Sequence, residues 1–165
     1  MKVEAHIVVR DAGEATHWYA RAFGAQEISR IPLPDGRLLT VVMRFGESEI
    51  HIASEFPELG ILSPSWIGGT ATVLQLSTND ADTLWSRALA AGATPRGELK
   101  DAFWGERHGQ LSDPFGHRWN IGQRIRDVPQ DELVGAAAKL FGLTTQETNP
   151  GLAHGETRST SSTTR

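Results

Sequence analysis

Two short glycine-containing sequences divide the chain into similar halves and limit the folds open to it. Ala22-Phe23-Gly24-Ala25 and Ala90-Ala91-Gly92-Ala93 lie 68 positions apart, and each ends a segment with helical periodicity that follows a strand-like segment. The apolar stripes of the two helices match with a slip of two residues, so the repeat is one of structure rather than of exact sequence. The sequence therefore predicts a duplicated module that contains strands and a helix.

The amino-acid composition limits the kinds of partner and the kinds of functional site that this protein can have. A chain of 165 residues that is 39% hydrophobic can bury one core, and the absence of cysteine excludes disulfides, thiolate zinc sites and cysteine nucleophiles. A net charge of −4 without a Lys/Arg cluster argues against nucleic acid as a partner. No apolar run approaches the roughly 20 residues that cross a bilayer, and no signal-peptide pattern begins the chain, so we expect a cytoplasmic protein.

The first module reads as β-α-β-β-β. The run Val3 to Arg10 is rich in β-branched residues and favours a strand, after which Asp11 stands at a helix N-cap position. The helix that follows has one apolar stripe and ends at Gly24. Turn residues then separate two further strand candidates, Leu38 to Phe45 and Ser48 to Ala53. We place this module at about residues 1–54.

The second module occupies about residues 70–125, after a connector at 55–69 that is rich in Pro, Gly and Ser. It begins with the strand candidate Thr72 to Thr78 and a helix capped by Asn79 or Asp80. Three more strands are expected, at Thr94 to Leu99, Gly105 to Ser112, and Arg118 to Arg124. Asp113-Pro114-Phe115-Gly116 lies between the last two and fits a type I turn, which predicts a hairpin.

The C-terminal part of the chain has a different pattern. Residues 126–143 form a helical appendage in this interpretation, because Pro129 to Phe141 has apolar residues on one side. From Thr144 onward Thr, Ser and Gly increase and hydrophobic residues become rare, so we predict a disordered tail at 144–165.

The hairpin sequence His108 to Trp119, His-Gly-Gln-Leu-Ser-Asp-Pro-Phe-Gly-His-Arg-Trp, together with two βαβββ modules, resembles the vicinal oxygen chelate superfamily of glyoxalases, bleomycin-resistance proteins and extradiol dioxygenases. Residues 19–25, 55–58 and 103–107 are similar to its PhnB-like branch. The resemblance covers about residues 1–125. It implies an α+β fold in which a curled mixed sheet surrounds a concave pocket, with the helices outside and a homodimer as the common assembly.

Strand alternation indicates which side chains would face that pocket. If the apolar positions of each strand pack under the helices, the intervening positions point to the concave side. The four strands nearest the expected pocket then contribute Glu4 or His6, His51, Gln75 and Asn120.

The resemblance also raises the question of a metal ion. Metal-dependent members of the family place a His or Glu on each of the four strands, whereas this chain has Asn120 on the last one and Val73, followed by Gln75, on the third. Amide oxygens bind zinc and iron poorly, so we expect no metal cofactor. The alternative is a divalent metal held by three ligands, either Glu4, His6 and His51 or Glu4, His51 and one amide.

Several of these residues have a structural interpretation beside the functional one. His6 and His51, with Glu4 beside them, are candidate acid/base groups because imidazole exchanges protons near neutral pH, or they are polar residues in a partly wet cavity. Of the five remaining ligand candidates, the three aromatic ones lie in connector or strand-entry positions. Trp66, Phe103 and Trp104 are candidates for stacking on a flat ligand, and the alternative for Trp66 and Trp104 is that they seal a dimer interface. Arg107 and Arg118 either bind an anionic group or form surface salt bridges.

The leading hypothesis is a metal-independent small-molecule-binding protein of the bleomycin-resistance kind, a homodimer that sequesters a drug-like or metabolite-like ligand and is not an enzyme. The alternative is a lyase, isomerase or dioxygenase of the same superfamily, with metal-assisted or His/Glu acid-base catalysis. A third hypothesis is an interaction subunit that docks a partner through the C-terminal helix and tail.

Overall fold

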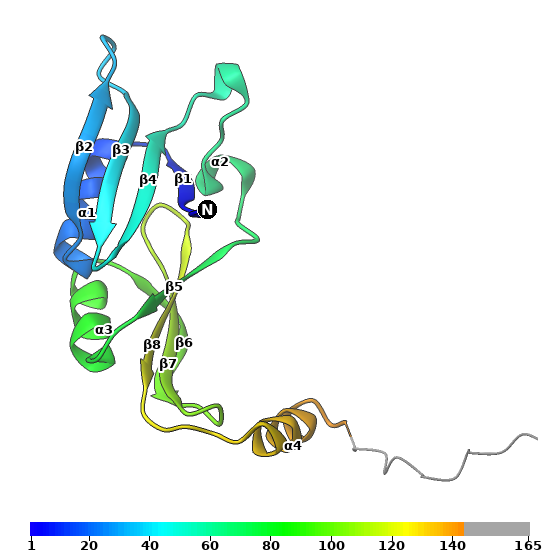
Figure 1. Ribbon diagram of the computed structural model, residues 1–165. Helices are drawn as coiled ribbons and strands as arrows, with labels where there is room; N and C mark the ends of the chain where they lie inside the picture. The colour runs from blue at the N-terminus through cyan, green and yellow to red at the C-terminus, as the bar shows by residue number, and fades with distance from the viewer. Residues whose placement is uncertain (144–165) are drawn as a thin grey trace, which may run out of the picture. The chain divides into compact units, whose positions relative to one another are not determined.

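The computed structural model describes residues 1–143 and divides the chain into two units (Figure 1). The first unit is Met1–Val128. The second begins at Pro129 and contains the helix α4, Gln130–Leu140, within the range expected for the C-terminal helix. The predicted disordered tail, 144–165, lies outside the described residues.

The first module forms a four-stranded mixed sheet in the order β1-β4-β3-β2. Its elements are β1 (Ala5–Val9), α1 (Ala12–Phe23), β2 (Gln26–Pro32), β3 (Leu38–Phe45) and β4 (Ser48–Ser54). Strands β1 and β4 pair in parallel, and the other neighbours pair antiparallel. This is the βαβββ arrangement predicted from the sequence.

The second module repeats this topology in a separate sheet with the order β5-β8-β7-β6. Its elements are β5 (Val73–Ser77), α3 (Ala81–Ala90), β6 (Thr94–Asp101), β7 (Glu106–Ser112) and β8 (Arg118–Arg124). Again the first and last strands pair in parallel. The prediction of an α+β fold built from two such modules is confirmed; the eight strands are divided between two open sheets.

Local sequence explains where the module helices begin and end. The Asp11 carboxylate accepts a hydrogen bond from the backbone N–H of Glu14 at 3.0 Å, and Gly24 ends α1 with a φ of 72°. Asp80 caps α3 in the same way, accepting from the N–H of Thr83 at 3.0 Å. The predicted caps are therefore confirmed at both helices.

The apolar positions of the strands pack under the helices, as alternation predicts. In the first sheet Ile7, Val9, Val41 and Ile52 are buried in the core, and α1 contacts this face of all four strands (Figure 1). The corresponding side chains of the second sheet are Leu111, Trp119 and Ile121, all fully buried. The intervening residues of each strand consequently lie on the opposite face, away from the helices.

A buried carboxylate joins the two modules. Asp113, at the first position of the predicted hairpin turn, accepts hydrogen bonds from the Tyr19 hydroxyl at 2.6 Å and from the Trp119 indole N–H at 2.8 Å. Its other oxygen accepts from the backbone N–H groups of Phe115 and His117. The turn sequence therefore does more than reverse the chain, because it also connects β8 to α1 of the other module.

Ionisation of the Tyr19 hydroxyl reports directly on whether this core is intact, because Tyr19 is the only tyrosine of the chain. Burial, and then the neighbouring Asp113 charge, raise the Tyr19 pKa well above its ordinary value. The folded state keeps a proton that the unfolded chain releases above about pH 10, so stability falls as the pH rises from there toward the folded pKa. We expect tyrosinate absorbance to appear only together with alkaline unfolding, monitored by circular dichroism. Tyrosinate forming in a fully folded protein would contradict this burial.

The connector between the modules contains ordered turns. It holds η1, Pro57–Leu59, and the short helix α2, Pro64–Ile67, and it is anchored by buried side chains at Phe56 and Ser63. Contacts between α2 and β1 place this segment along the outer edge of the first sheet. Within residues 1–143, none of the helices has the length and apolar character needed to span a membrane.

Candidate functional site

Two histidines meet on the face of the first sheet that α1 does not cover. His6 of β1 and His51 of β4 are register partners on parallel strands, and their ring centroids lie 5.9 Å apart. The third side chain of this row is Val42 of β3, which pairs with His51. The structure therefore brings together the two histidines that alternation places on the concave side.

His6 borders a hollow of about 360 Å³ between β1 and the connector, whereas His51 does not line it. Leu62, Pro64 and Ile67 supply apolar walls. His117 also lines the hollow, with its Nε2 2.9 Å from the Val8 carbonyl oxygen of β1. Partial burial, and then the neighbouring His51, lower the His6 pKa below its ordinary value of 6.5. His6 is consequently a neutral imidazole at pH 7, which can accept a proton or a hydrogen bond.

The His6 titration gives a quantitative test of this pairing. We expect a histidine Cε1–H resonance with a pKa below 6.5, and we expect His51→Ala to raise it without restoring the ordinary value, because burial contributes more than His51 does. The folded state resists protonating His6, so its contribution to stability is lost as the pH falls below about 6.5. An unchanged His6 pKa in His51→Ala would contradict the electrostatic coupling; His6→Gln assigns the resonance.

Glu4 lies apart from the histidine pair. It precedes β1, which starts at Ala5, and its carboxylate is 2.8 Å from the Lys2 ammonium group. Lys2 also contacts Glu49 at 3.3 Å, so the two acidic residues share one cation at this exposed edge of the sheet. The sequence placed Glu4 in the strand beside His6; the structure places it in an ion pair outside the strand.

The second sheet carries a row of three amides on the face that the helix leaves open. Gln75 of β5 pairs in register with Asn120 of β8, and Asn120 pairs with Gln110 of β7. The Gln110 Nε2 donates a hydrogen bond to Asn120 Oδ1 at 3.0 Å. Gln75 is exposed, whereas Gln110 and Asn120 are half-buried. We call these three residues the amide row.

Beside the amide row lies a second group of functional side chains. The Trp104 indole N–H donates to the Glu106 carboxylate at 2.9 Å, and the Trp104 and His108 rings are 5.2 Å apart at 71°. A Cβ on Gly122 would lie 2.7 Å from Gln75 Nε2 and 3.3 Å from Glu106 Oε2. The missing side chain at Gly122 thus leaves space into which the amide and the carboxylate extend.

The amide row and the histidine pair occupy equivalent positions in the two modules. His6 precedes the helix N-cap Asp11 by five residues, and Gln75 precedes the N-cap Asp80 by the same interval. His51 and Asn120 are their respective partners on the parallel neighbouring strand. The position equivalent to His6 is therefore Gln75 rather than Val73, and the two pairs lie on separate sheets of one chain.

The remaining candidates from the sequence are distributed over the surface. Arg107 forms ion pairs with Asp82 at 2.7 Å and Asp101 at 3.1 Å, and hydrogen bonds from these carboxylates raise its pKa further. Arg118 is exposed on the open face of β8, two residues before Asn120 in the same strand. Trp66 is 57% exposed on α2, beside the connector hollow.

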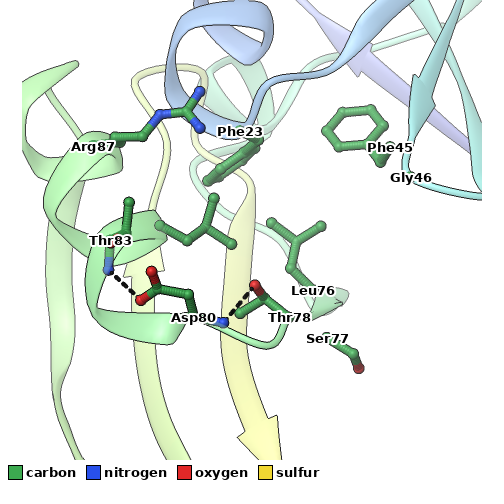
Figure 2. A pocket seen from close by; sticks show the side chains of 10 residues that line it. Phe23, Phe45, Gly46, Leu76, Ser77, Thr78, Asp80, Thr83 and Arg87 are labelled. Carbon is green, nitrogen blue, oxygen red and sulfur yellow. Dashed lines mark hydrogen bonds between the residues drawn. The ribbon is translucent and has the colours of Figure 1, made fainter.

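A further hollow of about 330 Å³ lies where the two modules meet (Figure 2). Phe23 and Phe45 of the first module face Leu76 of the second across it. Its charged groups already have partners within the fold, because Asp80 caps α3 and Arg87 donates to the Arg21 carbonyl oxygen at 3.0 Å. The Arg87 bond joins the two modules and Asp80 is used by the α3 cap, so the open sheet faces are the better candidates for ligand binding.

Sequence reasoning missed Glu106 and Gln110, although strand alternation puts both on the same face as His108. In β7 Gly109 and Leu111 are buried, and Glu106, His108 and Gln110 alternate with them, so these three share the opposite face. The sequence does not show which of the two faces of this strand is turned away from the helix. The buried roles of Asp113 and His117 carried no comparable signal, because turn residues are normally exposed.

Comparison with known proteins assigns the family. Residues 3–121 match the model of the Glyoxalase/Bleomycin resistance protein/Dioxygenase superfamily. The chain belongs to this superfamily. Uncharacterized proteins of Mycobacterium bovis and Mycobacterium tuberculosis H37Rv are each 39% identical to it over 134 residues, which make up 79% of this chain and 88% and 79% of theirs.

Solved structures of other proteins share the fold of this chain. A gene product from Arabidopsis thaliana is 26% identical with a TM-score of 0.59, covering 73% of this chain and 97% of that one. TioX from Micromonospora sp. ML1 is 22% identical with a TM-score of 0.60, covering 78% and 100%. A PhnB protein from Bacillus cereus is 16% identical with a TM-score of 0.59, covering 74% and 99%.

Metal-dependent members of the superfamily hold a divalent ion at the positions occupied here by two histidines and two amides. Of these four residues only His6 and His51 offer the ligands that zinc and iron prefer, and the carboxylate of Glu4 is apart from them, paired with Lys2. Among residues 1–143, no group of three or more His, Asp or Glu side chains is arranged to hold a metal ion. The donor set of this chain does not fit the metal centre of those relatives.

Proposed function

We propose that the protein binds a small molecule of drug-like or metabolite-like size on the open faces of its sheets, without a metal ion. The observation that supports this most is the replacement of metal-binding side chains by Gln75 and Asn120 at the positions equivalent to His6 and His51. Neutral amides recognise ligands by hydrogen bonding but are weak ligands for transition metals.

The test combines metal analysis with thermal unfolding. Protein purified without chelator is expected to contain no stoichiometric metal, and addition of Mg²⁺, Mn²⁺, Fe²⁺, Co²⁺, Ni²⁺ or Zn²⁺ is expected to leave the melting temperature unchanged, because only a ligand of the folded state raises it. Stoichiometric metal whose removal by chelator lowers the melting temperature, with loss of the effect in His51→Ala, would overturn the proposal.

A second candidate function is metal-free acid-base catalysis at the histidine pair. It is favoured by the lowered pKa of His6, which makes a neutral base available at pH 7 next to a second imidazole. Substrate conversion that is lost in both His6→Gln and His51→Ala, with the fold intact, would establish this function instead. Conversion that survives both changes would assign the chemistry elsewhere.

We also propose that two copies associate through β5. It is an edge strand, and the sequence from Thr70 to Thr78 around it contains no charged residue. The edge strands β2 and β6 carry charges, a proline and register irregularities, which are common protections against pairing with another chain. An unprotected edge of this kind favours pairing with another strand.

Sedimentation of matched variants tests the assembly. Val73 on β5 and Ile28 on β2 are 38% and 43% exposed. We expect a dimer that Val73→Lys converts to monomer and that Ile28→Lys leaves intact. A monomeric native protein, or a dimer equally sensitive to both changes, would reject the β5 interface.

A further inference from the structure

Gln110 and Asn120 of the amide row share one hydrogen bond, and the polar groups outside this bond define what can bind to the row. Gln110 uses its NH₂ group to donate to Asn120, and Asn120 uses its carbonyl oxygen to accept. An amide side chain has both a donor and an acceptor end, so the Gln110 carbonyl oxygen and the Asn120 NH₂ group are not part of this bond. The pair therefore offers one acceptor and one donor from adjacent strands.

We infer that the amide row recognises the N–H/C=O edge of a neutral amide or lactam attached to a flat ring, and this inference rests on the proposed small-molecule binding. The ligand carbonyl accepts from Asn120 Nδ2, and the ligand N–H donates to Gln110 Oε1. A carboxylate has only acceptors and would face the Gln110 oxygen, whereas an amidinium has only donors and would face the Asn120 NH₂. Only a group with one of each satisfies both side chains.

The aromatic part of the ligand has a surface beside the amide row. His108 precedes Gln110 by two residues on the same face of β7, a separation of about 7 Å along the strand. The Trp104 ring contacts His108 edge to face and is 39% exposed. Its N–H is directed to Glu106, which fixes the indole and leaves part of the ring free for stacking.

Three probes with the same ring separate the chemistries: benzamide, benzoate and benzamidine. In the ¹⁵N-labelled full-length protein, benzamide is expected to bind most tightly and to shift the side-chain NH₂ resonances of Gln110 and Asn120 together with the Trp104 indole N–H. Tighter binding of benzoate or benzamidine, shifts centred on His6 and His51, or no shift up to the solubility limit of benzamide would each overturn the inference.

An isosteric substitution makes the test sharper. Asn120→Asp keeps an acceptor for the Gln110 NH₂ group but replaces the free donor by a second acceptor. It is expected to weaken benzamide binding about tenfold and to favour benzamidine instead. Gln26→Glu, the same chemical change on exposed β2 of the other sheet, is the matched control and should alter neither affinity. Equal loss in both variants would contradict the assignment.

Gln110→Met provides a second variant if Asn120→Asp unfolds, since it removes the ligand acceptor and preserves the length of the side chain. It should weaken benzamide more than benzoate, which has no donor for the Gln110 oxygen, and an unaltered ratio of these two affinities would reject the inference. Failure of the amide preference is distinguishable from failure of the proposed function. The metal titration decides metal-independent binding separately, and its outcome does not depend on which probe binds the second sheet.

Discussion

Asp113→Ala is expected to destabilise the protein by about 3–5 kcal/mol, because it removes a buried carboxylate that accepts four hydrogen bonds. The Tyr19 hydroxyl and the Trp119 indole N–H would lose their acceptor inside the core, where each unsatisfied polar group is costly. The effect should exceed that of an ordinary turn substitution, since Asp113 also joins α1 of the first module to β8 of the second. Urea unfolding measures the change in stability.

The turn between β2 and β3 supplies the matched control. Leu33-Pro34-Asp35-Gly36 has the same pattern of backbone hydrogen bonds as Asp113-Pro114-Phe115-Gly116, but its Asp35 is exposed and pairs with Arg37. Asp35→Ala is therefore expected to change stability by less than about 1 kcal/mol. Similar losses for both aspartates would show that the buried network contributes little. Tyr19→Phe combined with Asp113→Ala gives the coupling between the two side chains.

Gly105→Ala is expected to cost about 3 kcal/mol or more, because a left-handed backbone and a steric clash act together. Gly105 has a φ of 86°, and a Cβ there would lie 2.4 Å from the backbone oxygen of Arg126 and 2.8 Å from Val128 Cγ2. The Gly105 carbonyl oxygen also accepts hydrogen bonds from the backbone N–H groups of Ile125 and Arg126. These bonds hold the backbone at Gly105 and the backbone at residues 125–126 against each other. The clash is therefore with a segment that has little freedom to move.

Gly46→Ala separates the two causes. Gly46 has a φ of 60° but no atom within 4 Å of an added Cβ, so it reports only the cost of the backbone conformation, about 1–2 kcal/mol. Gly105→Ala should also shift the Trp104 indole resonance, since Gly105 lies between Trp104 and Glu106. Equal urea midpoints for the two alanine variants would argue that the contact with Arg126 relaxes at no cost.

Most of the secondary structure follows from local sequence. Asp11 and Gly24 delimit α1 because the chemistry of caps acts within a few residues, and the Asp113 turn is read correctly for the same reason. Alternation assigns the faces of β1, β4, β5 and β8, since a residue between two apolar positions that pack against the core points to the opposite face. The duplication of the module is likewise visible in the spacing of the two glycine-containing helix ends.

The candidate site could be predicted only in part. His6 and His51, and Gln75 and Asn120, were assigned to the open faces from the strand pattern alone, and the structure pairs them in register. Their division between two sheets could not be predicted. Alternation shows on which face of its strand a residue lies, but it does not show which other strands join that strand in a sheet. Arg107 illustrates the same limit, since its partners Asp82 and Asp101 come from α3 and β6 and are chosen by packing.

The sequence by itself determined the module, its caps and turns, and the polar character of the open faces, because each depends on interactions between residues close along the chain. Only the tertiary structure decided that Asp113 is a buried acceptor for side chains of both modules and that Gln75, Asn120 and Gln110 form one row. The physical reason is that burial and strand register depend on contacts between segments distant in sequence, which local periodicity does not encode.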